Sequence, residues 1–174
     1  MGQLGAIISN TGKATLWYAD RLLDAIDARR FALKPRGPEG EIDTNHPAFI
    51  IGHLAIYPSW LVGMLGADAG PAAVTDSFKS HFAHTATCES DPDGTKYPPM
   101  EDIVRKFREA HLYLFGVLES TDDSLFDQPF PNEQMRDMFP TIGKGCDFMV
   151  GAHIMNHLGQ LSAWRRCFGM GSAM

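Results

Sequence analysis

Four apolar segments with helical spacing, separated by stretches rich in Pro and Gly, limit what this chain can fold into. The first covers residues 3–30, and the second starts at "TNHPAF" and continues through "IIGHLAIYPSWLVGML". The third begins at "YPPMEDI", and the fourth runs from Ile142 to Phe168. No stretch alternates polar and apolar residues for long enough to form a sheet. The sequence therefore predicts an all-α fold.

The length of 174 residues suits one domain with one buried core. We find no internal repeat and no low-complexity tract, so we expect a single domain over residues 1–174. Three polar, Pro-containing stretches, 31–45, 66–98 and 120–141, are predicted to be loops. The middle one is unusually long for a compact domain, and such loops are often functional.

Charge and composition exclude several classes of function. The net charge is −6 and no cluster of Lys and Arg exceeds a pair, which argues against nucleic-acid binding. We see neither an apolar run that would cross a bilayer nor a secretory signal, so no membrane partner is expected. The chain has an odd number of cysteines, Cys88, Cys146 and Cys167, and they lie far apart in the sequence. This pattern indicates free thiols in a reducing compartment. These features predict a cytoplasmic protein.

Three histidines form the candidate metal site. His153 and His157 are four residues apart, which places them on one face of a helix, about 6 Å apart along its axis. Two imidazoles at this spacing can bind one cation. A further ligand must come from another helix, and His53 is the best candidate because it stands among apolar residues, where a buried imidazole needs a partner. The simpler alternatives are a hydrogen-bonded core histidine for His53 and, for His153 and His157, an exposed pair that has this spacing by chance.

Other polar residues have two interpretations each. His111 shares a face with Phe107 and is either a fourth ligand or proton carrier, or a histidine at the edge of the core. His46 is about 10 Å from His53 along the helix, so a role at the helix start is favoured over ligation. Gln160 either orients a ligand or joins two helices. We expect Arg165 and Arg166 to cover a helix C-terminus rather than to bind an acidic substrate, and nothing in the sequence places His81 or His84.

The second helix carries two local expectations. Thr44 or Asn45 is expected to cap its start, because Pro47 is well tolerated in a first helical turn. Pro58 removes the hydrogen bond to the carbonyl of Leu54 and clashes with that turn. We therefore expect a kink directly after His53.

Two segments together resemble a known family. "NHPAFIIGHLA" and, about a hundred residues later, "HIMNHLGQLSAWRR" are similar to the DinB-like (DinB/YfiT-like) family, whose members carry HP-x4-GHL and H-x3-H-x-GQL-x3-R. The resemblance covers essentially the whole chain, although only these segments and the "YPPMEDI" entry to the third helix are specific. It implies an up-down-down-up four-helix bundle with long loops. It also implies one divalent metal ion, zinc or nickel, bound by His53, His153 and His157. Phe49 departs from the Trp of many members but keeps an aromatic ring.

The resemblance also implies a chemistry. Several relatives are S-transferases or isomerases that depend on a low-molecular-weight thiol, so it implies a thiol-dependent transferase that acts on a small molecule, and a homodimer. Three imidazoles with one open position are typical of catalytic rather than structural zinc. Two alternatives stay open: a metal-dependent hydrolase, which would want a nearby carboxylate as general base, and a non-catalytic metal-binding protein with a closed coordination shell.

Overall fold

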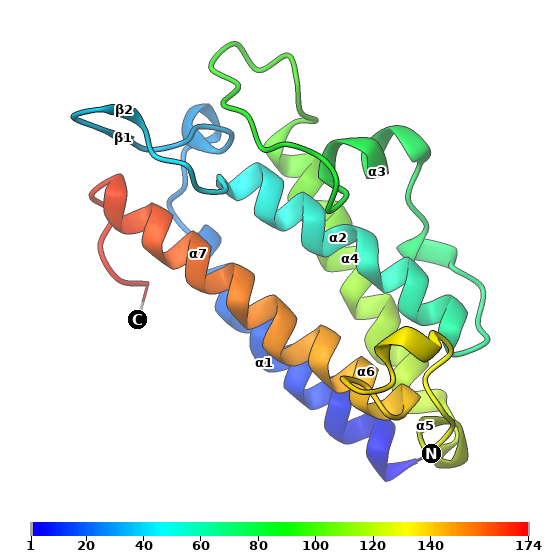
Figure 1. The fold of residues 1–174 in the computed structure, drawn as a ribbon. Coiled ribbons are helices and arrows are strands. Elements are labelled where there is room, and N and C mark those ends of the chain that lie inside the picture. Colours follow the sequence, from blue (N-terminus) through cyan, green and yellow to red (C-terminus); the bar gives the residue numbers. More distant parts are fainter. Residues whose placement is uncertain (1, 174) are drawn as a thin grey trace.

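Apolar faces on four long helical segments form the core of the molecule. The structure, a computed structural model, describes residues 2–173. Its long helices are α1 (Gln3–Leu23), α2 (Pro47–Met64), α4 (Met100–Ser120), and a last segment made of α6 (Ile142–Phe148), the π-helical turn η4 (Met149–His153) and α7 (Ile154–Cys167). Figure 1 shows α6 at the lower end of the bundle and α7 running from there along its length. The predicted all-α class is confirmed.

The four segments pack in a closed square. Helix α1 packs against α4 and α7, and α2 packs against the same two helices from the other side. Helices α1 and α7 run in one direction, whereas α2 and α4 run in the opposite direction (Figure 1). Fully buried side chains from the helices fill the space between them, among them Leu22, Ile50, Phe107 and Leu161. The arrangement makes α2 and α7 direct neighbours, which positions the site described below.

The connecting stretches contain short elements that the sequence did not predict. They are η1 (Ala28–Arg30), the antiparallel hairpin of β1 (Arg36–Gly37) and β2 (Gly40–Glu41), η2 (Gly70–Ala72), α3 (Asp76–Phe82), α5 (Asp123–Phe126) and η3 (Glu133–Met135). The most consequential is α3, which lies within the long stretch 66–98 and packs against α2. That stretch is therefore partly helical rather than a plain loop.

The first helix is shorter than its apolar pattern predicted, because it ends at Leu23 instead of near residue 30. Ala25 adopts a positive φ of 61°, which turns the chain away from the helix axis. The buried guanidinium of Arg165 donates hydrogen bonds of 2.7 Å from Nη1 to the carbonyls of Leu22 and Asp24. Arg165 thus covers a helix C-terminus, as expected, but that of α1 rather than of its own helix.

Helix α2 differs from expectation at its start and around Pro58. Its N-cap is His46, whose Nδ1 accepts a hydrogen bond from the backbone N–H of Phe49, and neither Thr44 nor Asn45 takes that role. The helix continues unbroken through Pro58, where we expected a kink (Figure 1). Pro58 is itself buried, so packing on both sides of α2 offsets the cost of about 3 kcal/mol of an interior proline.

One helix of the described chain is long and apolar enough to cross a bilayer. It is α2, which we did not single out from the sequence. In the structure 67% of this segment is buried inside the bundle. Such burial is typical of the central helix of a soluble protein.

Candidate metal centre

His53 lies in the middle of α2 and is held from behind by α3. Its side chain is 6% exposed, and its Nδ1 lies 2.8 Å from the backbone carbonyl of Phe82, the last residue of α3. Since a carbonyl can only accept, Nδ1 carries the proton and donates it. This fixes the tautomer and leaves Nε2 of His53 as a free lone pair. A histidine ligand is commonly oriented by a partner of this kind.

His153 and His157 stand where the last helical segment changes its pitch. His153 closes the π-helical turn η4, and His157 lies one turn into α7. A π-helical turn leaves a carbonyl without its α-helical partner. Here the hydroxyl of Thr15, from α1, lies 3.0 Å from the carbonyl of Val150. Single π turns within α-helices are frequent at functional sites.

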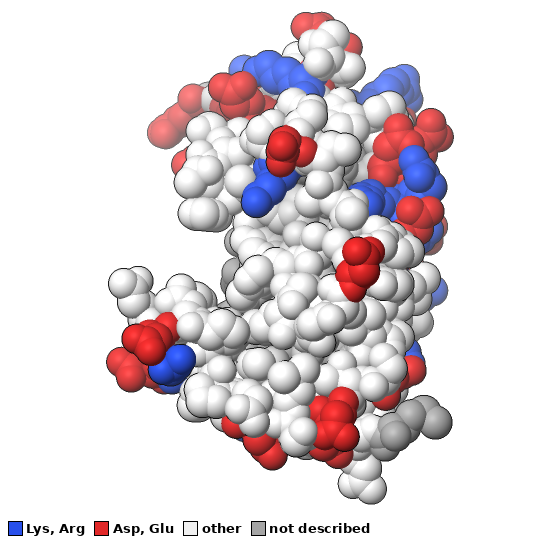
Figure 2. Space-filling model, turned by 90° about the vertical axis from the view of Figure 1, so that its right-hand side faces the viewer, with Lys and Arg blue, Asp and Glu red and all other residues white. Residues whose placement is uncertain are grey.

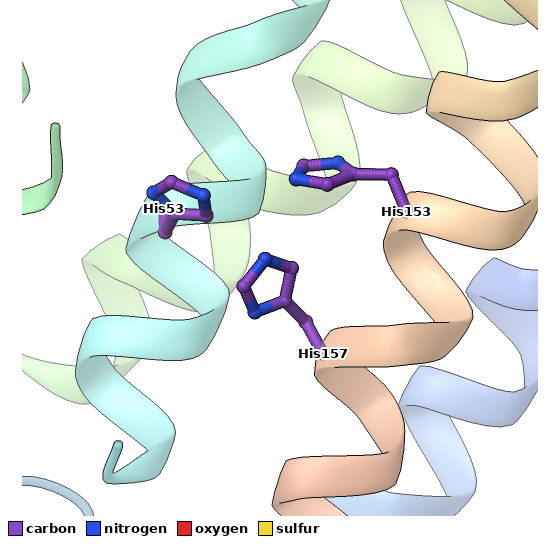
Figure 3. A group of neighbouring side chains, drawn as sticks. All are labelled: His53, His153 and His157. Carbon is purple, nitrogen blue, oxygen red and sulfur yellow. The ribbon is translucent and has the colours of Figure 1, made fainter. Parts of the chain in front are cut away.

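The three imidazoles converge on one point between α2 and α7. One nitrogen from each of His53, His153 and His157 lies within 4.8 Å of the other two. The ring centroids are 5.7 Å apart for His53 and His153, 4.8 Å for His53 and His157, and 4.9 Å for His153 and His157. Figure 3 shows the three rings turned toward the shared space. A tetrahedral ion with bonds near 2.0 Å would draw the nitrogens to about 3.4 Å from one another, which small side-chain rotations supply.

Burial keeps all three rings neutral at neutral pH. Desolvation, and after it the neighbouring His157, His53 and His111, lowers the pKa of His153 from 6.5 to about 4. The pKa of His157 is lowered by desolvation and then by His53, and that of His53 by desolvation as well. A metal ion needs unprotonated imidazoles. The centre therefore presents its ligands in the form that binds metal.

Three buried side-chain nitrogens of the described residues have no hydrogen-bond partner: Nδ1 of His153, Nδ1 of His157 and, away from the centre, Nε of Arg165. A buried polar atom without a partner is costly. An ion or a water molecule between the two helices would satisfy the histidine nitrogens. This observation fits a metal centre with its ordered solvent better than it fits three core histidines, which would be bonded to the protein.

The ligand cluster contains no carboxylate and no thiolate from the described chain. Cys88 and Cys146 are buried elsewhere, and burial raises the pKa of both thiols, that of Cys146 to about 12. Cys167 is exposed, and it too lies outside the cluster. Three histidines are thus the only His, Cys, Asp or Glu side chains that the described residues bring together here, and a tetrahedral ion would keep a position for another group.

The remaining described histidines lie outside the ligand cluster. His111 is buried, and its Nδ1 lies 2.8 Å from the carbonyl of Phe107 on its own helix. It is not part of the ligand cluster, so its expected alternative as a core histidine fits better than a fourth ligand. His46 acts at the start of α2, as expected, with Nε2 2.9 Å from the carbonyl of Glu89. His81 and His84 also lie outside the cluster.

Gln160 combines its two interpretations. Its Oε1 accepts a hydrogen bond of 3.2 Å from the Asn45 side chain, which links α7 to the start of α2. It also lies close enough to His157 to oppose the lowering of that pKa. Gln160 therefore both joins two helices and borders the centre.

Sequence reasoning missed Tyr57. Its hydroxyl lies 3.3 Å from Nε2 of His53, and its ring centroid is 4.9 Å from that of His153. Because burial raises its pKa, the phenol stays protonated and donates to the free Nε2 lone pair. Its position four residues after His53 places both on one face of α2, a signal that was present in the sequence.

Comparisons with known proteins do not identify the chain: no protein-family model, no curated protein and no solved structure matches it. The three-histidine geometry is therefore the main evidence on function.

Proposed function

We propose that the protein is a metal-dependent enzyme that holds one divalent ion between His53, His153 and His157. The observation that carries this proposal is the convergence of three neutral imidazoles, one buried and two half-buried, with no Cys, Asp or Glu among the described residues joining them. Structural zinc sites usually have four protein ligands, whereas catalytic sites keep a position open. The open position makes catalysis the favoured role over metal storage or structure.

The DinB-like resemblance supports the same proposal. The pattern places its histidines at the three positions that meet in the structure, and the opposed directions of the α1/α7 and α2/α4 pairs (Figure 1) suit an up-down-down-up bundle. We propose membership of this family on those grounds, with zinc or nickel as the ion. Three imidazoles suit either metal.

The charge of the centre favours an anionic ligand from outside. Three neutral imidazoles leave the two positive charges of a divalent ion uncompensated, and neither α2 nor residues 148–164 contain an acidic side chain. An ion held there lowers the pKa of a thiol or water bound to it and so provides a nucleophile at neutral pH. A hydrolase would in addition want a carboxylate base beside the bound water, and the ligand cluster contains none.

The reaction that fits best is transfer of an external low-molecular-weight thiol to an electrophile. The thiol loses its proton to solvent, its sulfur forms the new S–C bond, and the leaving group of the acceptor departs with the bonding electrons. The protein's own thiols do not compete, because the two buried ones have raised pKa values and none reaches the cluster. The chain contributes the three imidazoles, the orienting carbonyl of Phe82 and the hydroxyl of Tyr57.

A conjugation assay tests this function. Protein loaded with zinc or nickel is incubated with cysteine or glutathione and a panel of alkyl and benzyl halides, and thioether products are measured by mass spectrometry. We expect conjugation above the uncatalysed rate, and its loss in His157→Ala. If loaded protein with full metal stoichiometry accelerates no pair in the panel but cleaves simple esters, the transferase is wrong and the hydrolase takes its place.

A further inference from the structure

A row of aromatic rings leads from the metal centre to the molecular surface. Phe148, the last residue of α6, lies 6.3 Å from His153 between ring centroids, and the two planes are nearly parallel at 30°. Phe148 contacts Phe139 at 4.9 Å, Phe139 contacts Phe130 at 5.5 Å, and Phe130 contacts Trp60 at 6.1 Å. The row thus begins at a ligand and ends on the outer face of α2.

The two outer members of this row are open to solvent and the inner two are not. Trp60 is 44% exposed and Phe148 is 36% exposed, whereas Phe130 and Phe139 are 1% and 4% exposed. The buried rings support the exposed ones from behind, so the surface is already formed before anything binds to it. Tyr57 lies on the same stretch of α2, three residues before Trp60, and faces His153. We call Tyr57, Trp60 and Phe148 the aromatic surface.

Two of the segments that carry the aromatic surface are uncharged, whereas α6 has Lys144 and Asp147 shortly before Phe148. Neither α2 nor residues 148–164 contain a Lys, Arg, Asp or Glu. Figure 2 shows a face on which charged side chains gather toward the upper and lower ends and leave a mostly uncharged band between them. A charged group of a substrate would find no ion-pairing partner on these two elements. An uncharged, flat, apolar group would bury aromatic area that is now exposed to water.

We propose that the aromatic surface binds an uncharged aromatic group of the acceptor substrate, next to the ion. This inference rests on the proposed function, because that function makes the bound group part of the acceptor substrate. It adds the chemical class of the acceptor. The Phe148 ring stacks on His153, so a ring packed on Phe148 would lie close to a residue that would hold the ion. An aromatic acceptor would therefore be held with its reactive carbon beside the activated thiol.

Two hydroxamates that differ only in an aromatic ring test the proposal without any turnover. Benzohydroxamate and acetohydroxamate both bind metal ions, and calorimetry on the zinc-loaded protein gives the ratio of their affinities. We expect a preference of about tenfold for the aromatic probe, the size of one good ring contact. Trp60→Ala should lose most of this preference while acetohydroxamate binds as before, and Phe148→Ala, which removes the ring stacked on His153, should lose the preference as well. Trp17→Ala, which removes a 58% exposed Trp from α1, is the matched control and should keep it.

A second probe separates this inference from the metal assignment. The affinity for 2-naphthol, an uncharged aromatic molecule, is measured on chelator-treated protein, and it should fall about tenfold in the same two variants and stay unchanged in Trp17→Ala. If neither hydroxamate binds the wild type while 2-naphthol does, the metal centre is refuted and the aromatic site is not. Equal binding of 2-naphthol by wild type, Trp60→Ala and Phe148→Ala would overturn the aromatic site.

Discussion

The hydroxyl of Tyr57 donates to Nε2 of His53, the lone pair that a metal ion would use. The phenol and the ion therefore compete for one atom. Because Nδ1 of His53 donates to the carbonyl of Phe82, a flip of the ring would not provide a second nitrogen to accept from the phenol. The hydroxyl must find another partner when an ion binds, and the ligand in the open position is the nearest one.

Replacing Tyr57 by Phe tests this competition. The ring and its packing against His153 are kept, and only the hydroxyl is lost. A neutral hydrogen bond contributes about 1 kcal/mol, so we expect the metal Kd of Tyr57→Phe to stay the same or to fall by up to about fivefold. Competition with a chromophoric chelator measures it. Tyr113→Phe, whose hydroxyl bonds the carbonyl of Asp68, serves as control. A Kd raised tenfold or more would show that the Tyr57 hydroxyl is itself a ligand.

At the scale of elements, the π-helical turn η4 decides how His153 faces the centre. Its freed Val150 carbonyl is within reach of the Thr15 hydroxyl, which also lies 2.8 Å from the carbonyl of Gly12 and so shares one hydrogen between two acceptors. The turn thus depends on a contact from α1, more than a hundred residues away in the chain.

Thr15→Val keeps the shape of this buried side chain and removes its only donor. The Val150 carbonyl then loses its partner, and we expect a loss of about 1–3 kcal/mol in the free energy of unfolding. We also expect metal affinity to fall about tenfold, since a relaxed α-helical turn would rotate His153 away from His157. Urea unfolding and metal titration measure the two effects. Thr11→Val, one turn earlier on α1, should change neither. Lost stability with unchanged metal affinity would mean that Thr15 does not hold the turn.

The start of α2 predicts a pH dependence. Desolvation lowers the pKa of His46 from 6.5 to about 4, and its neutral Nδ1 is the acceptor that caps the helix. The folded state binds the proton less well than the unfolded state, so this stabilisation is complete above pH 6.5 and is lost as pH falls toward 4. The full effect is on the order of 3 kcal/mol.

His46→Asn keeps a capping side chain that does not titrate. Between pH 7.5 and pH 5, in the presence of a chelator, its unfolding free energy should decrease by about 2 kcal/mol less than that of the wild type. Both proteins keep the other buried histidines, so their titration cancels in the comparison. Parallel pH profiles for the two proteins would show that His46 is not the group responsible.

These elements also show what the sequence could predict. The helical spacing of apolar residues locates the start of α4 to within three residues, because that helix has one buried and one exposed face. The same rule extends α1 seven residues too far, since the Arg165 cap that helps end it comes from the other end of the chain. It also treats the last segment as one α-helix. The contact of the Thr15 hydroxyl with the Val150 carbonyl comes from α1 and leaves no signal in the sequence of that segment.

The histidine cluster was predictable from the sequence, but its surroundings were not. His153 and His157 lie close through helical spacing alone, and His53 joins them because α2 and α7 are neighbours in the bundle. The carbonyl of Phe82 could not be anticipated, because a backbone group has no sequence signature. The row of rings from Phe148 to Trp60 was equally hidden, since its members come from α2, α6 and a connecting stretch.

At the scale of the whole molecule, the centre ties together two helices that are far apart in the sequence. His53 belongs to α2, and His153 and His157 lie about a hundred residues later. An ion bound only by the folded state stabilises that state by mass action, by about 4 kcal/mol when its concentration is a thousand times the Kd. For a chain of this length, that corresponds to a rise of roughly 10 °C in Tm.

Metal stoichiometry together with chelator-dependent melting tests the central claim most directly. Wild type, His53→Ala, His153→Ala, His157→Ala and the control His84→Ala, an exposed histidine outside the cluster, are purified identically. The account predicts one divalent ion per chain and a Tm that a chelator lowers by roughly 10 °C in wild type and His84→Ala. The three ligand variants should be folded, hold little metal and hardly respond to the chelator. Full stoichiometry and full chelator sensitivity in His53→Ala would contradict the proposed centre.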